Sequence, residues 1–396
     1  MATKEYKKVI VWFVYAFAVI WGSSLPGISL PGISLFPLRI IIILWTLWAL
    51  MRKKKIEKVL IFKIEPTTTA LFIFIIWSII TSSWVCNYKA YITAFIVYLT
   101  AICTLIICKV ECEQNENYFY YAGIAIYWNV IIMCIISIYE SFTGKYLYES
   151  YDYYLTTFNA FGLFRPKAAF YNTNNLTVFL LTCLPISLFA VKKFLPKILI
   201  IVLSTIVIFL TESRTGIVGL IMFLALYLLY SAYSLKGSKL IITILIVVIA
   251  LCLFINYSDV IFQSITNGNN VDDEDRLPIW KSMIQLCQNY FFMGAGPGQS
   301  AHIKGSLGLP HNYFLEILLE FGIIGLISFL CIVRFSFIPR KYILKDNKSI
   351  YLRCYMWLFI LCTICPSSMQ GYYYLWYIFG ICIAYNNKQR NTVEVN

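Results

Sequence analysis

The sequence predicts an all-α polytopic membrane protein with about twelve transmembrane helices. Apolar residues make up 60% of the 396 residues, charged residues make up only 13%, and the mean hydropathy is +0.75. A soluble protein of this length would carry about a quarter of its residues as charged side chains. Long apolar runs recur from one end of the chain to the other, so we expect a single integral membrane domain, residues 1–396.

The expected transmembrane helices are the apolar runs that are long enough, or nearly long enough, to cross a bilayer. They cover residues 9–25, 36–51, 68–84, 90–108, 118–139, 174–191, 195–211, 216–233, 239–255, 312–333, 350–366 and 370–385. Several are closer to 17 than to 20 residues, which predicts helices that stand nearly upright. The largest polar segment, residues 256–311, lies between the ninth and tenth runs.

The basic residues support this count and orient it. With the N-terminus in the cytoplasm, 23 of the 32 Lys and Arg residues fall in cytoplasmic loops and 9 fall on the far side. This asymmetry is typical of membrane proteins and predicts that both termini are cytoplasmic. Because the cations lie in short loops between apolar runs, the net charge of +13 does not indicate a nucleic-acid partner.

The cysteines and acidic residues give little indication of a metal site or a disulfide framework. Most of the 13 cysteines lie in apolar runs, including Cys362 and Cys365, and we interpret them as small apolar fillers. The acidic run from Asp272 to Asp275 is interpreted as a solvated turn, with a metal site as the alternative. We expect no metal and no cofactor.

The basic residues on the far side are exceptions to the charge pattern and need an explanation. Four of them are arginines, whose guanidinium groups can donate two hydrogen bonds to one phosphate. Arg39 lies just inside the second span. The sequence leaves two roles for it, snorkelling to the interface and anion binding. The tandem repeat before it, residues 25–34, is interpreted as a loop-like structural feature at the mouth of a span.

Two polar segments lie at the mouths of the sixth and eighth spans. The aromatic loop of residues 140–173 fits an interfacial belt or a sugar-binding platform. Its last part carries Arg165 and Asn172, and Asn174 follows at the start of the sixth span. The turn of residues 212–216 places Arg214 nearly at membrane depth, where an ionisable residue is costly and usually functional. An ion pair with Glu212, or exposure at the interface, is the alternative for this arginine.

The segment after Arg276 has apolar residues at helical spacing, which predicts an amphipathic helix at the membrane surface. A glycine-rich turn follows at residues 294–298, and its backbone N–H groups are candidates for binding an anion. His311 then begins the tenth span, as a cap or as a functional group. Glu320 lies well inside that span, where an acid calls for a cationic partner.

In their order and spacing, these segments resemble the O-antigen ligase and polymerase superfamily of bacterial polysaccharide assembly, over roughly residues 160–330. Ala168 and Thr173 stand where that family usually has Gly and Pro. The resemblance rests on four segments: Arg165-x-x-Ala168-x-Phe170-x-Asn172-Thr173-Asn174; Ser213-Arg214-Thr215-Gly216; Arg276-x-x-x-Trp280 with Gly294-Ala295-Gly296-Pro297-Gly298; and His311-Asn312-x-x-Leu315 with Glu320-x-Gly322-x-x-Gly325.

The resemblance implies a metal-independent, inverting glycosyltransferase with a mostly helical, GT-C-like membrane fold. The donor would be a glycan on undecaprenyl diphosphate, and the acceptor a glycan, as in a polymerase, or the lipid A core, as in a ligase. Other expected partners are the lipid bilayer and further polysaccharide assembly proteins. The enzyme would lie in the bacterial inner membrane, with an active site that includes residues 256–311 and faces the periplasm or the exterior.

The residues then take named roles. As catalytic residues, Arg214 and Arg276 would stabilise the diphosphate, and His311 would orient or deprotonate the acceptor hydroxyl. The expected substrate-binding residues are Arg165, Asn172, Asn174, Trp280, Asn312 and Glu320. A flippase for the same lipid-linked glycan is the alternative of another class, although it would more often show two similar halves. A non-catalytic assembly protein is the third possibility.

Overall fold

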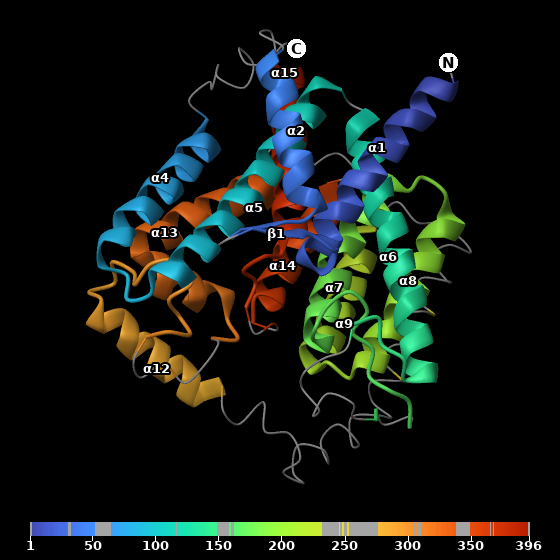
Figure 1. Ribbon diagram of the computed structural model, residues 1–396. Coiled ribbons are helices and arrows are strands. Elements are labelled where there is room, and N and C mark those ends of the chain that lie inside the picture. Colours follow the sequence, from blue (N-terminus) through green and yellow to red (C-terminus); the bar gives the residue numbers. More distant parts are fainter. Residues whose placement is uncertain are drawn as a thin grey trace. The chain divides into compact units, whose positions relative to one another are not determined.

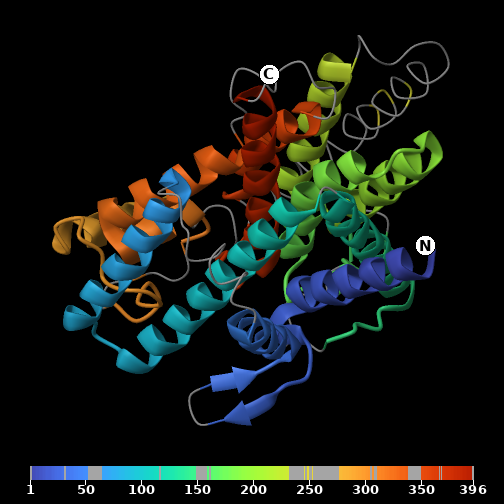
Figure 2. The same cartoon turned by 90° about the horizontal axis from the view of Figure 1, so that it is seen from above.

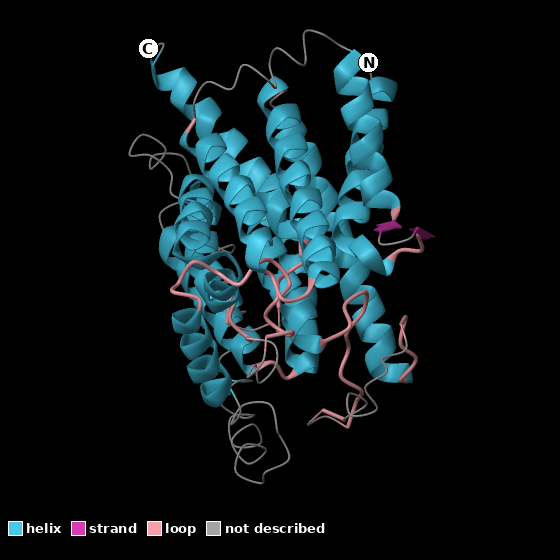
Figure 3. Cartoon of the chain, turned by 60° about the vertical axis from the view of Figure 1, so that its left-hand side comes forward, coloured by secondary structure: helices cyan, strands magenta, loops and turns pink. Residues whose placement is uncertain are grey.

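The computed structural model is predominantly helical, as Figures 1 and 3 show, and confirms an all-α polytopic membrane protein. It describes residues 2–30, 33–51, 65–115, 117–148, 158–159, 162–231, 245, 248, 252, 276–303, 306, 310–337, 349–364, 366 and 368–394. The helices in these ranges are α1 (Ala2–Trp21), α2 (Pro37–Met51), α4 (Pro66–Thr81), α5 (Tyr88–Gln114), α6 (Asn117–Thr143), α7 (Thr173–Ala190), α8 (Phe194–Thr211), α9 (Arg214–Ser231), α12 (Arg276–Asn289), α13 (Tyr313–Phe337), α14 (Ser349–Cys362) and α15 (Tyr373–Glu394).

Within the described residues, 7 helices are long and apolar enough to cross a membrane, and two shorter apolar helices join them, Pro37–Met51 and Arg214–Leu228. The expected span of residues 239–255 lies almost entirely outside the description, as does much of the loop of residues 256–311. Every other expected range overlaps a helix. The count of twelve spans therefore stays a prediction.

The exposed faces of these helices are apolar, as a lipid environment requires. Helix α8 exposes Leu195, Leu199, Val202 and Ile206, which recur every three or four residues along one face. Its opposite face buries Ile200, Ile201, Val207 and further apolar residues, together with the small polar Ser204. A helix that is apolar on both its buried and its exposed faces is stable in a membrane.

The chain divides into two compact units. The first comprises residues 1–9, 120–274 and 343–366. Its central helix is α7, in which every residue from Leu176 to Ala190 is buried, and α7 packs against α8, α9 and α14. Glycines allow α9 to approach α7 closely, because a Cβ at Gly216 or Gly219 would overlap the side chains of Thr177 or Leu181.

The second unit comprises residues 10–119, 275–342 and 367–396. Helix α13 packs along α4 and α15 packs along α5, while α12 lies against α13 (Figure 1). Aromatic rings fill the interior of the unit. The ring of Phe321 stacks on Phe74 at 4.4 Å between centroids and meets Tyr98 edge-on at 4.8 Å.

The tandem repeat at residues 25–34 is a β-hairpin and not the loop that its sequence suggested. Strands β1 (Ile28–Leu30) and β2 (Ile33–Leu35) pair antiparallel, as Figure 2 shows, with Ser29 opposite Ser34. Both copies contain the same Ile-Ser-Leu triplet, whose alternation of apolar and polar residues suits a strand. Apart from this hairpin, named secondary structure in the described residues is helical.

Candidate functional site

In the first unit, the first two motif segments contact each other. The guanidinium group of Arg165 forms an ion pair with the carboxylate of Glu212. The hydroxyl of Ser213 donates to the amide oxygen of Asn174 at 2.8 Å. Arg214 is half-buried at the start of α9. Glu212, which the sequence offered as an alternative partner for Arg214, forms an ion pair with Arg165.

The two asparagines of the first motif hold its backbone. Asn172 caps α7, because its amide oxygen accepts the backbone N–H of Asn174 at 2.7 Å. Asn174 in turn accepts from Ser213 and so joins the start of α7 to the start of α9. These contacts give both residues a structural role, and their contact with substrate stays a prediction.

Sequence reasoning missed Glu140, which anchors the loop that carries Arg165. This carboxylate is fully buried at the end of α6 and accepts three backbone N–H groups, from Leu147 at 3.0 Å, Lys167 at 2.9 Å and Ala168 at 2.8 Å. A buried carboxylate needs such donors to offset its loss of hydration. The available signal was its position next to a transmembrane run, where an acid is costly.

Tyr146 further orders the same loop. Its hydroxyl donates to the backbone oxygen of Arg165 at 3.1 Å, and the Lys167 ammonium lies 4.5 Å from the centre of its ring. Burial and then the nearby Glu140 raise the pKa of Tyr146, so its hydroxyl stays protonated and able to donate. The backbone around Arg165 is therefore fixed from several directions.

Ala168 has a backbone conformation that favours glycine. Its φ is +47°, in the left-handed region, which costs an L-amino acid energy and costs glycine almost nothing. The two N–H groups that Lys167 and Ala168 donate to Glu140 require the turn to take this shape. This turn therefore places an alanine in a backbone shape that suits glycine.

In the second unit, α12 is the helix that the sequence predicted after Arg276. Its inner face, Met283, Leu286 and Cys287, forms an apolar cluster with Leu319 of α13, while Leu277 and Ile284 are exposed. Arg276 is the first residue of α12, and its side chain lies outside the description.

Trp280 and Asn312 fix the backbone on either side of His311. The indole N–H of Trp280 donates to the backbone oxygen of Pro310 at 2.8 Å. The amide oxygen of Asn312 accepts the N–H groups of Phe314 and Leu315, at 3.0 and 3.2 Å, and caps α13. His311 lies between them, half-buried, with a φ of +47°. The third and fourth motif segments are thus joined at the predicted catalytic histidine.

The glycine-rich turn docks into a break in α13. Gly322 has a φ of +65° and a ψ of −167°, which interrupts the helix. Across the break, Leu319 O accepts from Ala295 N at 2.8 Å, and Ile323 N donates to Phe292 O at 2.9 Å. In a regular helix, the N–H of Ile323 would instead donate to the carbonyl oxygen of Leu319.

This docking corrects the expectation of an anion site in the turn and shows which described backbone groups approach Glu320. The N–H groups of Ala295 and Gly296 bind carbonyl oxygens of α13, at 2.8 Å each, and are not arranged to hold an external anion. In the described part of the chain, the Glu320 carboxylate is approached by the backbone N–H groups of Gly298 and Ser300, the latter at 3.5 Å, where an arginine was expected. Its Oε2 atom is buried without a hydrogen-bonding partner among those residues.

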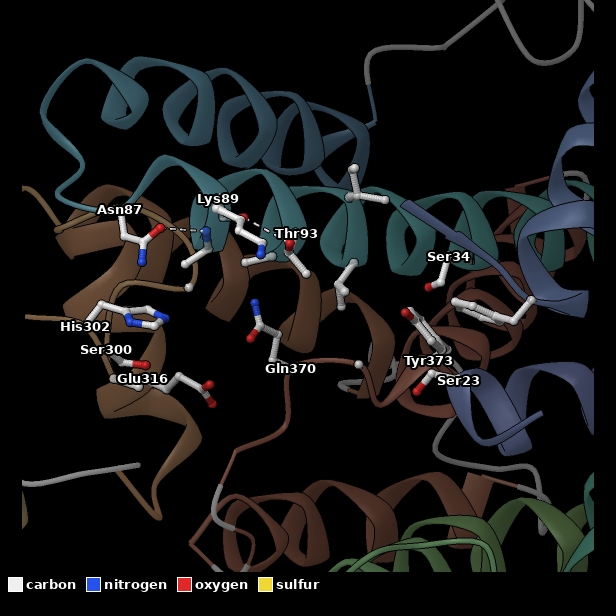
Figure 4. Close-up of a pocket in the computed structure, with 18 of the residues that line it drawn as sticks. Ser23, Ser34, Asn87, Lys89, Thr93, Ser300, His302, Glu316, Gln370 and Tyr373 are labelled. Carbon is white, nitrogen blue, oxygen red and sulfur yellow. Dashed lines mark hydrogen bonds between the residues drawn. The ribbon is translucent and has the colours of Figure 1, made fainter. Parts of the chain in front are cut away.

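A cavity of about 710 Å³ opens beside this turn, within the second unit (Figure 4). Gly298, Ser300 and His302 line one end, together with Glu316 of α13. Its other walls include Asn87, Lys89 and Thr93 at the start of α5, and Ser34 and Tyr373 at the far end in Figure 4. Arg39 also lines the cavity and donates to Ser34 O at 2.7 Å. Gln370 projects into the space between the two ends in Figure 4.

Hydrogen bonds connect Glu316, which lines the cavity, to the loop before α15. The Glu316 carboxylate accepts the hydroxyl of Ser368 and the backbone N–H of Met369, the latter at 3.2 Å. Among the residues that the structure describes, no group of three or more His, Cys, Asp or Glu side chains could hold a metal ion. The side chains of the cavity are instead suited to hydrogen bonding and charge recognition.

The fold and these motif contacts define a multi-pass, α-helical membrane protein with polar residues gathered at helix ends and a polar cavity. Residues 199–330 match the family model of the O-antigen ligase, which confirms the resemblance to the O-antigen ligase and polymerase superfamily. No curated protein matches the chain. The family match supports an enzyme of the ligase or polymerase type, which acts by glycosyl transfer in surface polysaccharide assembly.

Proposed function

We propose that the protein is a glycosyltransferase that moves a glycan from undecaprenyl diphosphate to an acceptor glycan, as a surface polysaccharide polymerase. The observation that carries the proposal is the match to the O-antigen ligase family over the segment that contains Arg214, Arg276 and His311. The contact between the two motif segments of the first unit supports it, because it orders the backbone beside Arg214.

The chemistry requires a positive environment for the leaving group. In the proposed step the acceptor hydroxyl oxygen attacks the anomeric carbon, the bond from that carbon to the diphosphate oxygen breaks, and the diphosphate leaves with the electron pair. Arg214 lies at the N-terminus of α9, where the helix dipole adds to the guanidinium charge. Arg214 and Arg276 would stabilise the diphosphate, with Arg165 as a third binding group.

His311 is the proposed proton acceptor. An imidazole with a pKa near neutrality can take the proton of the acceptor hydroxyl as that oxygen attacks. The bond from Trp280 to Pro310 and the Asn312 cap fix the backbone on both sides of it. A single displacement of this kind inverts the anomeric centre, and the arginines supply the charge that a metal would otherwise provide.

The test is glycan transfer in a strain that lacks the protein, complemented with wild type or variants of equal membrane expression. We expect Arg214→Ala and Arg276→Ala to lower turnover by a factor of about 10²–10³, the usual effect of losing one transition-state donor. His311→Gln should abolish transfer. The control is Arg334→Ala, which removes an exposed arginine at the other end of α13.

The products separate the candidate functions. Loss of long polymer, with single repeats still attached to their acceptor, indicates a polymerase. Loss of all attached glycan, with lipid-linked polymer accumulating, indicates a ligase. Normal transfer in all three active-site variants would contradict the enzyme assignment and favour a flippase or an assembly protein.

A further inference from the structure

Several polar residues of the second unit gather at one cavity without belonging to any of the motif segments. Arg39 comes from α2, Lys89 from α5 and Gln370 from the loop before α15. The same cavity is walled by Gly298 of the glycine-rich turn and by Glu316, one helical turn before Glu320. Motif residues and residues with no assigned role thus share one space of about 710 Å³.

The cations of the cavity are arranged for a ligand from outside. Arg39 is half-buried and oriented by protein contacts, with Nη1 donating to Ser34 O at 2.7 Å and Nε to Thr100 Oγ1 at 3.3 Å. Lys89 is exposed at the start of α5. The single carboxylate among the described lining residues, that of Glu316, already accepts bonds from Ser368 and Met369. Positive charge therefore predominates in the described lining.

The remaining walls suit a sugar. Gln370 Nε2 is buried without a hydrogen-bonding partner among the described residues, although its side chain projects into the cavity in Figure 4. A buried amide donor without a partner is costly, and a ligand oxygen would satisfy it. The hydroxyl of Thr93 donates to Lys89 O at 2.9 Å and can still accept from a ligand, while Val97 provides apolar surface for the face of a sugar ring.

We propose that this cavity binds the acceptor glycan, and that Lys89 toward one end and Arg39 toward the other each recognise a carboxylate of that saccharide. Gln370 binds an uncharged oxygen of the same saccharide. The inference rests on the proposed function, because it takes the ligand to be the acceptor of the glycan transfer.

Binding to the purified full-length protein in lipid nanodiscs tests the site without any transfer reaction. The probes are digalacturonate and its methyl ester, which differ mainly in charge, and inorganic pyrophosphate. We expect wild type to bind the acid about tenfold more tightly than the ester, as expected for charge-assisted hydrogen bonds. Pyrophosphate should not displace digalacturonate.

The variants separate charge recognition from the rest of the site. Lys89→Glu should remove the preference for the acid while binding of the ester stays unchanged, and Arg39→Lys should weaken the preference. Gln370→Ala should weaken the binding of both the acid and the ester. Lys145→Glu is the matched control, since it reverses an exposed lysine charge in the first unit, and it should leave both affinities unchanged.

Three results would overturn the inference. The first is equal affinity of the wild type for the acid and the ester. The second is an equal effect of Lys89→Glu and Lys145→Glu on the preference for the acid. The third is displacement of digalacturonate by pyrophosphate. In the transfer assay, Lys89→Glu should raise the KM for the acceptor and leave the KM for the donor unchanged; the reverse pattern also overturns it. A protein that binds digalacturonate as described but transfers no glycan contradicts the proposed function and leaves the saccharide site standing.

Discussion

The loop that carries Arg165 in the first unit and the glycine-rich turn in the second unit are held in place by different kinds of contact. In the first unit, side chains carry the connection, with Glu140 binding loop N–H groups and Arg165 binding Glu212. In the second unit, backbone binds backbone, and the turn around Gly294 docks into α13 at Gly322. The first arrangement depends on charge and hydrogen bonding, whereas the second depends on the absence of side chains.

The difference predicts which substitutions each unit tolerates. Where glycine backbones meet, any Cβ overlaps neighbouring main chain, which cannot move aside as a flexible side chain can. Where side chains carry the contact, a conservative substitution can keep part of the interaction. The predictions below test this contrast, from the largest expected effect to the smallest.

Gly322→Ala should be the most damaging change. The new Cβ would overlap the backbone of Met293 and Phe292, and the φ of +65° would also become strained. We therefore expect the free energy of unfolding to fall by about 3–5 kcal/mol. Thermal unfolding of the purified protein in detergent measures it. Gly162→Ala is the control, since Gly162 has a φ of +71° with nothing within 4 Å in the described structure, and strain alone should cost about 1 kcal/mol. Equal losses would show that docking is unimportant.

Glu140→Gln should destabilise the first unit by about 2–3 kcal/mol. The amide keeps one acceptor oxygen but loses the charge that three backbone N–H groups share. Trypsin should cut faster at Lys145 or Lys167, because the loop opens more often. Glu5→Gln, an exposed acid in α1, should change stability by less than about 0.5 kcal/mol. Unchanged proteolysis in Glu140→Gln would contradict the anchoring role.

Exchanging the charges of Arg165 and Glu212 separates structure from substrate binding. Either single charge reversal should lower the free energy of unfolding by about 1 kcal/mol, since the pair is partly exposed. The double variant Arg165→Glu with Glu212→Arg should recover that stability. Glycan transfer should stay low in it, because the guanidinium group no longer stands where the diphosphate is proposed to bind. Full recovery of transfer would show that Arg165 has a structural role and does not bind the diphosphate.

Ala168→Gly should have the smallest effect, and a favourable one. Glycine accepts a φ of +47° without strain, and we expect a gain of about 0.5–1 kcal/mol, a rise in Tm of about 1–2 °C. Ala169→Gly is the matched control, because Ala169 is buried and lacks a positive φ, so the same substitution should lower the Tm. A fall in Tm for both variants would show that the left-handed backbone at Ala168 is not strained.

What the sequence could predict depended on local pattern. Apolar runs marked α5, α8 and α13, and the spacing of Leu277, Trp280 and Met283 marked α12. The motif segments were also recognisable, and the structure joins them in pairs within each unit. These features are local, because span length, helical period and short motifs can each be read from a single stretch of chain.

The remaining features depend on contacts between distant segments. Arg39 and Lys89 are 50 positions apart, and Gln370 is far from both, so no periodicity relates them. Glu140 looked like an ordinary acid at a helix end, because its donors come from a loop up to 28 residues away. The hairpin was hidden because its repeat contains proline and glycine, which suggest a loop when the cross-strand register is unknown.

The break in α13 also bears on how the protein is made. A helix with unpaired backbone groups at Leu319 and Ile323 would be costly to leave in lipid, by several kcal/mol per group. The turn that satisfies these groups precedes α13 in the chain and is synthesised first. Insertion of α13 in its broken form thus requires the preceding turn to satisfy these two groups.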